Sequence, residues 1–504
     1  MKSSKAEIHA KYHKIPVIQF EDQRLTSFSG ILIFQALFKR INLKTRLGNC
    51  FSHLKVSPIF GRHLVVLLLI VHLLLGFRRL REVDYYRDDP LVLRLLGLRK
   101  LPDVSTISRA LSKMESEGVE NVRELSRSLV IEGLKRECLP RLTLDFDGSV
   151  QSTKGHAEGT AVGFNKKKKG SRSYYSLFCT VAQTSQFFDL LHRPGNVHDS
   201  NGADQFIMQC FDKTKEELKN TIFESRMDSA FFSETILSVL DSRYVKFTAS
   251  VPFARFPQLK EIIENRKRWR TIDREWSYFE TKWKPKSWNT TYRFIFTRRK
   301  NKKQYKGPLQ LHLFEPRDYQ FDYKVIVTNK TESTKRVVLF HNGRGSQEAI
   351  FGDAKTDAAL DIIPTKRLAG NQIFTRLRRK PRPPGRGGMR VSSVALAKED
   401  WSFGGLCRTK GATGSCPWGS TLCSMMAHNL SRELQMLASP AVPRALPKRP
   451  SAWAFERLDT LRHRIIQRAG RLTKPQGELT LTMSANHAVR QDLLHFLDVV
   501  KKAA

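Results

Sequence analysis

The chain has 504 residues, of which 40% are hydrophobic. This is enough apolar material for two to four domains with true cores, so the composition excludes a disordered polymer. Lysine and arginine number 87 against 48 acidic residues, which gives a formal net charge of +39. Because basic residues recur in nearly every segment, the charge predicts a long contact with a polyanion such as nucleic acid.

The cysteines and the apolar stretches indicate where the protein resides. The 7 cysteines are odd in number and form no Cys-x-x-Cys pair, which is typical of reduced thiols in a cytoplasm. The apolar stretch 64–77 has about 14 residues and contains His72, whereas a bilayer span needs roughly 20. We therefore predict a buried helix there and no membrane association. The N-terminus lacks the pattern of a secretory signal, so we expect no export.

Residues 1–140 read mostly as helices. One helix is predicted after Pro102, with Asp103 or Ser105 as its N-cap and an apolar stripe along one face. The stripe consists of Ile107, Leu111 and Met114. Its outward polar face is what a DNA-reading helix needs, but an ordinary amphipathic helix gives the same pattern.

From residue 141 the pattern changes to short runs typical of strands. The segment 141–147 alternates and ends in acidic residues, and 174–182 and 187–192 are its predicted partners. Helices are predicted from 201 and from 233. Strands that alternate with helices imply an α/β core.

The second half of the chain is less uniform. Residues 245–335 are strand-like and rich in aromatic residues, most of which we expect to fill a sheet core. Residues 375–420 show no periodicity although both neighbours look helical, and we interpret this segment as an insertion or a reading-frame disturbance. The predicted divisions are a helical N-terminal DNA-binding region at 1–140, the first part of the core at 141–244, a β-rich insertion at 245–335, a core piece with a glutamate-bearing helix at 336–374, the anomalous segment at 375–420, and the completion of the core with a helical tail at 421–504.

Three acidic residues far apart in the chain have settings that suit metal ligands. Asp147 and Asp228 end predicted strands, and Glu348 lies on a predicted helix. Arg344 lies four residues before Glu348 and Lys355 seven after it, so a continuous helix would place all three on one face.

This combination predicts phosphodiester chemistry. Two divalent cations about 4 Å apart can activate the attacking oxygen and relieve the leaving oxygen. Mg²⁺ prefers oxygen ligands and keeps several waters, so three carboxylates suffice to hold the pair. We expect Asp147 to bridge both ions, and Asp228 and Glu348 to complete one each. Arg344 and Lys355 would grip the phosphates of the strand that is cut.

The same residues resemble bacterial insertion-sequence DDE transposases of the cut-and-paste type. The third motif of that family is tyrosine-arginine-glutamate-lysine with spacings of two, three and six residues, and here His341, Arg344, Glu348 and Lys355 keep the spacing. Other segments similar to the family's landmarks are 144–149, 193–203, 226–232, 367–372, 474–476 and 479–486. The likeness covers most of the chain except 375–420.

The resemblance implies a ribonuclease-H-like core interrupted by a β-rich insertion before the glutamate. It implies cleavage and strand transfer at terminal inverted repeats with Mg²⁺ or Mn²⁺, binding of double-stranded repeat and target DNA, a homodimer in the DNA complex, and a cytoplasmic, nucleoid-associated location in bacteria. Related enzymes stabilise a hairpin intermediate with a tryptophan of the insertion, and Trp288 is our candidate. The Gly-Ser after Asp147 matches the family, but Asp145 remains an alternative first ligand.

Two further observations leave alternatives open. His341 replaces the motif's tyrosine, and the segment 375–420 follows the glutamate helix closely, so a catalytically inactive relative that occupies or represses the element ends is the second hypothesis. A structure-specific nuclease is the third. Lys167 and Lys168, in a Gly-bounded basic loop, would follow backbone phosphates, although a solvated loop has the same composition.

Overall fold

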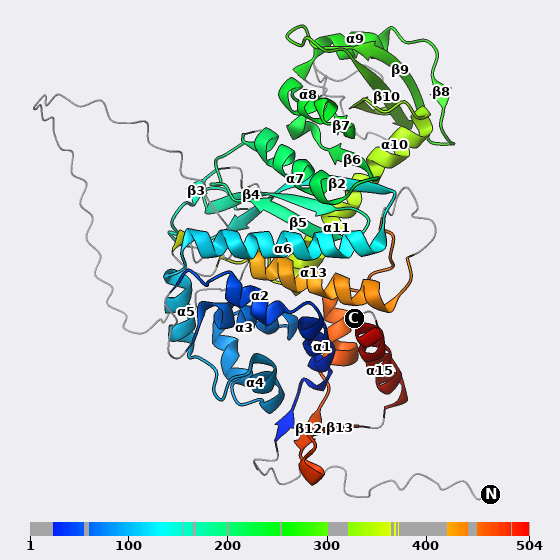
Figure 1. Cartoon of the computed structure of the whole chain (residues 1–504). Helices are drawn as coiled ribbons and strands as arrows, with labels where there is room; N and C mark the ends of the chain where they lie inside the picture. The colour runs from blue at the N-terminus through cyan, green and yellow to red at the C-terminus, as the bar shows by residue number, and fades with distance from the viewer. Residues whose placement is uncertain are drawn as a thin grey trace, which may run out of the picture.

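The computed structural model describes residues 24–54, 60–153, 155–163, 165, 168–198, 201–252, 255–300, 321–363, 367–368, 371, 421–441, 451–484 and 486–502 (Figure 1). The prediction that 375–420 is an insertion or a frame disturbance, and the prediction of a DNA contact at Lys167, fall outside these residues.

A large mixed sheet forms the centre of the molecule. Its strands are β2 Arg141–Ser152, β3 Ala161–Val162, β4 Arg172–Val181, β5 Gln186–Leu191, β6 Ile222–Met227, β7 Lys246–Ser250, β8 Arg270–Thr271, β9 Trp276–Trp283, β10 Tyr292–Lys300 and β11 Phe321–Thr328. The 10-stranded sheet has the order β3-β4-β2-β6-β7-β11-β10-β9-β8, with β5 paired to β4. Strands β2, β6 and β7 are parallel, and β4, β5 and β11 are antiparallel to their neighbours.

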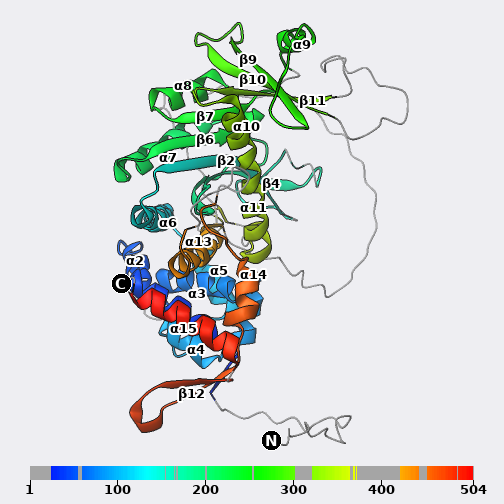
Figure 2. The same ribbon diagram turned by 90° about the vertical axis from the view of Figure 1, so that its right-hand side faces the viewer.

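The strands predicted from alternation are confirmed in type and position. Strand β2 is longer than predicted, because Ser149 and Gln151 continue the inward side of the alternation as far as residue 152. The β-rich stretch after residue 245 does not form a sheet of its own. Strand β11 pairs with β7, so β8 to β11 extend the central sheet (Figures 1 and 2).

Helices account for most of the remaining described residues. They are α1 Leu32–Arg40, α2 Leu43–Asn49, α3 Arg62–Leu74, α4 Pro90–Leu96, α5 Val104–Ser112, α6 Ser116–Glu137, α7 Ala203–Glu217, α8 Glu234–Ser242, α9 Pro257–Glu264, α10 Thr334–Asn342, α11 Ser346–Asp357, α13 Thr421–Ala438, α14 Leu458–Leu461 and α15 His487–Lys502. A second, small sheet joins β1 Leu25–Thr26 with β12 Gly470–Thr473 and β13 Thr480–Met483.

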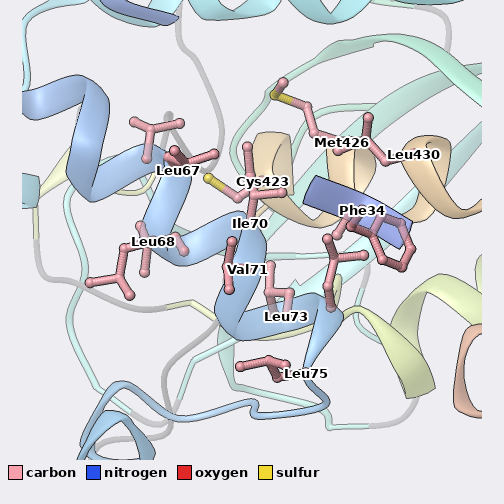
Figure 3. Close-up of a cluster of buried hydrophobic side chains, with 14 of the residues drawn as sticks. Phe34, Leu67, Leu68, Ile70, Val71, Leu73, Leu75, Cys423, Met426 and Leu430 are labelled. Atoms are coloured by element: carbon pink, nitrogen blue, oxygen red, sulfur yellow. The ribbon is translucent and has the colours of Figure 1, made fainter. Parts of the chain in front are cut away.

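The apolar stretch at 64–77 is a buried helix, as predicted. Every residue of α3 from Val65 to Leu74 is buried, and α3 packs against α13 and α2. Figure 3 shows Leu67, Ile70 and Val71 of α3 near Cys423 and Met426 of α13. In the described part of the chain, no helix is long and apolar enough to cross a membrane.

The helix after Pro102 is also confirmed. It begins at Val104 with Asp103 at the N-cap position, and the predicted stripe of Ile107, Leu111 and Met114 is buried. The sequence also predicts a basic helix at 455–469, and this prediction is wrong in extent. Helix α14 ends at Leu461, and one π-helical turn follows because Arg462 turns inward and donates to the carbonyls of Leu73, Leu74 and Asp357.

The two faces of the sheet are covered differently. On one face Phe146 of β2 contacts Phe206 and Phe211 of α7. On the other face α10 and α11 run across the strands, as Figure 2 shows. Because successive strand residues point to opposite faces, Asp145 and Asp147 lie on the face that α10 and α11 cover.

Candidate active site

Strands β2 and β6 bring two of the predicted acids to the same edge of the sheet. The strands are parallel, and Asp145 is level with Arg226. Asp147 and Asp228 each lie two residues further along the chain, so both follow the last register pair of β2 and β6 at the same end of the two parallel strands. This is the carboxyl edge of the parallel strands, where α/β proteins place their ligands.

The two carboxylates are accessible but held by the backbone. The side chain of Asp147 is 24% exposed, and its Oδ1 accepts a hydrogen bond from the Gly148 amide at 2.8 Å. Asp228 is partly exposed and caps the 3₁₀ turn η3 (Ser229–Phe231), since its Oδ1 accepts from the Ala230 amide at 2.9 Å. One carboxylate oxygen of each side chain is therefore bound by a nearby backbone amide, for Asp147 within β2 and for Asp228 directly after β6.

The segment that carries Glu348 is helical throughout. Between α10 and α11 lies the 3₁₀ turn η5 (Gly343–Gly345), and Asn342, Gly343, Gly345 and Ser346 all have right-handed helical dihedrals. The continuous helix that the spacing predicted is thus present, with one tighter turn in the middle.

Contacts show how this helical segment crosses the sheet. His341 binds Thr248 and Ser250 of β7, at 3.0 Å each. Gln347, fully buried, donates to the carbonyl of Asp145 in β2 and to Oγ1 of Thr180 in β4. Phe351 then packs edge to face on rings of β4 and β5. These are Phe178 and Phe187.

Of the remaining predicted residues, this crossing brings Arg344 beside one of the two acids. Glu348 directly follows Gln347 and is exposed in the first turn of α11. Arg344 Nη1 lies 3.7 Å from Asp147 Oδ2, so the predicted cation is beside the predicted ligand. Lys355 is two turns further on, where its ammonium lies 5.7 Å from the centre of the Phe351 ring.

Asp145, the alternative first ligand, is in a different environment. It is 1% exposed, and Arg226, equally buried, binds its two carboxylate oxygens. Burial raises the pKa of Asp145, and the charge of Arg226 opposes that rise. Arg226 binds both carboxylate oxygens of the buried Asp145, whereas the side chain of Asp147 is partly exposed. Asp147 is therefore the better placed of the two for a metal ion.

His341 lies inside the protein and not at the surface where a DNA contact was predicted. It is 1% exposed, and both ring nitrogens are used by β7. Burial, reinforced by the charges of Lys324, Arg344 and Arg226, holds its pKa well below the ordinary range. The position of His341 differs from the prediction because its imidazole ring is neutral and enclosed. In this structure His341 fastens the helical segment to β7.

Trp288 also faces the interior. Its ring stacks on Phe232 at 4.7 Å and is 9% exposed, which agrees with the expectation that most rings of this stretch fill the core. A role in holding a hairpin would require this ring to leave Phe232. Lys168, by contrast, is exposed in its loop.

The family profile described as transposase DDE domain group 1 matches residues 9–378. The chain belongs to this transposase family. The match covers most of the chain and includes all three predicted acids. No curated protein matches the chain.

Solved transposase structures show only distant likeness to this transposase. A piggyBac transposase synaptic complex with hairpin DNA is 12% identical, covering 65% of this chain and 68% of that chain, with a TM-score of 0.33. A Mos1 transposase paired-end complex with left transposon end is 10% identical, covering 38% of this chain and 60% of that one, with a TM-score of 0.16. The family assignment therefore depends on the sequence profile.

Three residues of this region were not predicted from the sequence of the transposase. Arg226 and Gln347 have signals that could have been used, because Arg226 lies two residues before Asp228 and Gln347 lies directly before Glu348. Lys324 of β11 had none. Burial lowers its pKa to about 8, and the charge of Arg344 adds to the shift, so Lys324 belongs to the same positive region.

The acids do not form a closed metal site by themselves. Among the residues that the structure describes, no group of three or more His, Cys, Asp or Glu side chains could hold a metal ion. The oxygen-only donors at the strand ends suit a hard cation such as Mg²⁺ or Mn²⁺.

Proposed function

We propose that the protein is a DNA transposase that cleaves the ends of an insertion sequence and joins them to target DNA. The observation that carries the proposal is the arrangement at one sheet edge. Asp147 and Asp228 each lie two residues beyond the last register pair of β2 and β6, Arg344 lies 3.7 Å from Asp147, and Glu348 is on the helix that crosses the same sheet. Family membership supports the same activity.

The fold that we infer is a ribonuclease-H-like core. The strand order β5-β4-β2-β6-β7 supports it, with β2, β6 and β7 parallel, Asp147 within β2 just past the stretch that pairs with β6, and Asp228 directly after β6. Strands β8 to β11 enter the chain between β7 and the helix that carries Glu348, which fits the expected β-rich insertion. Residues 1–140 remain our candidate DNA-binding region.

Asp147, Asp228 and Glu348 are the residues that would hold divalent ions. Bound Mg²⁺ or Mn²⁺ would lower the pKa of a water or hydroxyl nucleophile and offset charge on the leaving oxygen. The partly exposed carboxylates of Asp147 and Asp228 are preorganised for this by the backbone amides that bind them. Glu348 would be brought into range by α11, whose position Gln347 fixes.

The cations around the acids would hold the DNA. In the absence of DNA, Arg344 lies against Asp147, and its planar guanidinium suits a phosphate once metal ions neutralise the carboxylate. Lys355 and Lys168 would add positive charge for DNA binding. The net charge of +39 supports a long contact with the DNA backbone.

The finer features that the resemblance implied stay part of this proposal. They are a bacterial insertion-sequence type, terminal inverted repeats as the bound DNA, a homodimer in the DNA complex and a cytoplasmic, nucleoid-associated location. A hairpin intermediate held by Trp288 is the least supported, because that ring is buried on Phe232.

The second candidate is a catalytically inactive relative that occupies the element ends. It is favoured by one observation. The family match ends at residue 378, where the anomalous segment has just begun. Such a protein would bind end DNA with the same basic residues but would not cut it.

Cleavage of a plasmid that carries the element ends separates these possibilities. We expect Mg²⁺-dependent nicking by the purified protein, loss of nicking in Asp228→Ala and Glu348→Ala, and normal nicking in Asp212→Ala, an exposed acid paired with Arg243 on the other side of the sheet. Activity that survives both active-site changes refutes the assignment. Binding without nicking by the unaltered protein establishes the inactive relative, and cutting without strand-transfer products establishes a nuclease.

A further inference from the structure

The buried ion pair between Asp145 and Arg226 joins β2 and β6 two residues before Asp147 and Asp228. Each side chain is 1% exposed. Arg226 Nε lies 2.9 Å from Asp145 Oδ1, and the second guanidinium nitrogen binds Oδ2. The two residues are direct partners in the parallel register of β2 and β6, so the fork bridges the strands at one level.

The same pair contacts the helical segment that crosses the sheet. Arg226 Nη1 donates to the carbonyl of Phe340 at 3.4 Å, and the guanidinium carbon lies 5.3 Å from the centre of the Phe340 ring. Gln347 donates to the carbonyl of Asp145 at 3.1 Å. One ion pair therefore touches β2, β6 and both ends of the turn that carries Arg344.

Stability alone is a poor explanation for such a pair. Desolvation of two charges commonly cancels their attraction, and apolar residues of similar volume often replace buried pairs without loss of stability. Buried pairs are best attested as devices that fix register. A slip of β2 by one residue would separate Asp145 from Arg226 and turn Asp147 to the opposite face of the sheet.

We propose that the Asp145–Arg226 pair is a positioning device that holds Asp147 and Asp228 level for metal binding, and that Asp145 is not itself a ligand. The inference rests on the proposed function, because it assigns the metal ions to Asp147 and Asp228. It gives the first acid of Asp-Phe-Asp a role distinct from that of the second.

The test replaces the pair by apolar residues of similar size, Asp145→Leu with Arg226→Met. The matched control is Asp189→Leu with Arg123→Met, another buried two-point ion pair, which links α6 to β5 away from the acidic edge. Both double variants are expected to melt within about 5 °C of the unaltered protein. Mn²⁺ binding is then measured from the electron paramagnetic resonance signal of the free ion, and the metal requirement is measured from plasmid cleavage.

We expect the Asp145/Arg226 variant to need about tenfold more Mn²⁺ for half-saturation and for half-maximal cleavage, which is the usual effect of losing a residue that orients metal ligands. The Asp189/Arg123 control should bind Mn²⁺ as the unaltered protein does. Arg226→Lys keeps the charge but loses the fork, and we expect a smaller shift in the same direction.

Normal Mn²⁺ binding by the folded double variant overturns the positioning role and leaves the proposed function intact. If the double variant does not fold, Arg226→Lys decides, and normal Mn²⁺ half-saturation in that variant overturns the role. An unaltered protein that neither binds Mn²⁺ nor cuts end DNA overturns the proposed function and this inference together.

Discussion

The side-chain amide of Gln347 donates a hydrogen bond to the main-chain carbonyl of Asp145, 3.1 Å away, and thereby fastens α11 to the strand that carries Asp147. The same amide nitrogen lies 3.0 Å from Oγ1 of Thr180 in β4. Glu348 is the next residue, and its own side chain is exposed. The position of the third acid is thus set by its neighbour in the chain.

We expect Gln347→Leu to slow cleavage about tenfold or more while it destabilises the fold by about 1–2 kcal/mol, because buried polar partners lose their donor and Glu348 loses its support. Single-turnover plasmid cleavage measures the loss of rate, and urea unfolding measures the loss of stability. Gln435→Leu in α13 is the control, since that buried amide binds the carbonyl of Glu456 far from the acids. Equal cleavage rates in the two variants would remove the anchoring role.

Arg344 should contribute to DNA binding in a way that salt reveals. Arg344→Ala removes one cation that we expect to meet a phosphate, so the slope of log affinity against log salt should fall by about 1. Arg344→Lys should keep most of that slope but lose part of the affinity, because an ammonium cannot bind a phosphate with two parallel bonds.

Fluorescence anisotropy with a labelled end duplex at several salt concentrations gives these slopes. Arg243→Ala is the control for loss of a surface arginine, since Arg243 is paired with Asp212. An unchanged slope in Arg344→Ala would place Arg344 outside the DNA interface.

Local patterns predicted much of the fold. Alternation placed β2, β4 and β5, and an apolar run that contains one histidine placed α3 in the interior. The helix expected at 455–469 failed where a tertiary contact prevailed, because Arg462 leaves the surface to bind carbonyls of α3. The sequence gives no sign that the partners of this arginine are backbone oxygens of residues far away in the chain.

The candidate site was predictable as a set of acids and less so as a geometry. Predicted strand ends and helical spacing identified Asp147, Asp228 and Glu348 as candidates, because those signals are local. The pairing of Asp145 with Arg226 joins residues 81 positions apart and depends on the register of two strands, which the sequence does not state. Spacing alone also could not distinguish Arg344, which lies near the acids, from His341, which the sheet encloses.

Buried histidines should make the fold sensitive to acid. Burial lowers the pKa of His72 to about 3, and burial together with Arg432 lowers the pKa of His428 to about 3. The ordinary value in an unfolded chain is about 6.5. Between pH 6.5 and 3 the unfolded state therefore binds the extra proton, and each histidine should cost about 1.4 kcal/mol of stability per unit as pH falls. Above pH 6.5 neither contributes a pH dependence.

Urea unfolding at pH 7.5 and 5.5 measures this loss. His428→Gln keeps a donor for the carbonyl of Ser185 but cannot titrate, so its stability should fall less on acidification. His463→Gln is the control, because that side chain is 71% exposed. A pH dependence that is the same in His428→Gln as in the unaltered protein would contradict the assignment.

The anchors on either side of residues 375–420 predict the effect of removing that segment. The amide of Gln151 donates both to the carbonyl of Leu360 and to Oγ1 of Thr421, and Asn371 donates to the hydroxyl of Tyr174. Gln151 and Tyr174 are direct partners in β2 and β4. Chain on both sides of the segment is thus bound to one pair of neighbouring residues.

Helix α13, which follows the segment, is fastened to the sheet by contacts of its own. Asn429 binds both the amide and the carbonyl of Phe187, at the open edge of β5. Such a contact covers a strand edge that is otherwise free to pair. We therefore expect α13 to hold its place when residues 375–420 are removed.

We expect a chain in which about eight glycine and serine residues replace 375–420 to fold with a melting temperature at least equal to that of the unaltered protein, because a shorter closed loop costs less entropy. Differential scanning calorimetry checks the stability, and plasmid cleavage checks the activity. Asn429→Ala in the shortened chain should lower the melting temperature, since it leaves the edge groups of Phe187 unpaired. A shortened chain that aggregates or melts much lower would show that the segment takes part in the fold, whereas higher cleavage by the shortened chain would show that the segment impairs the active site.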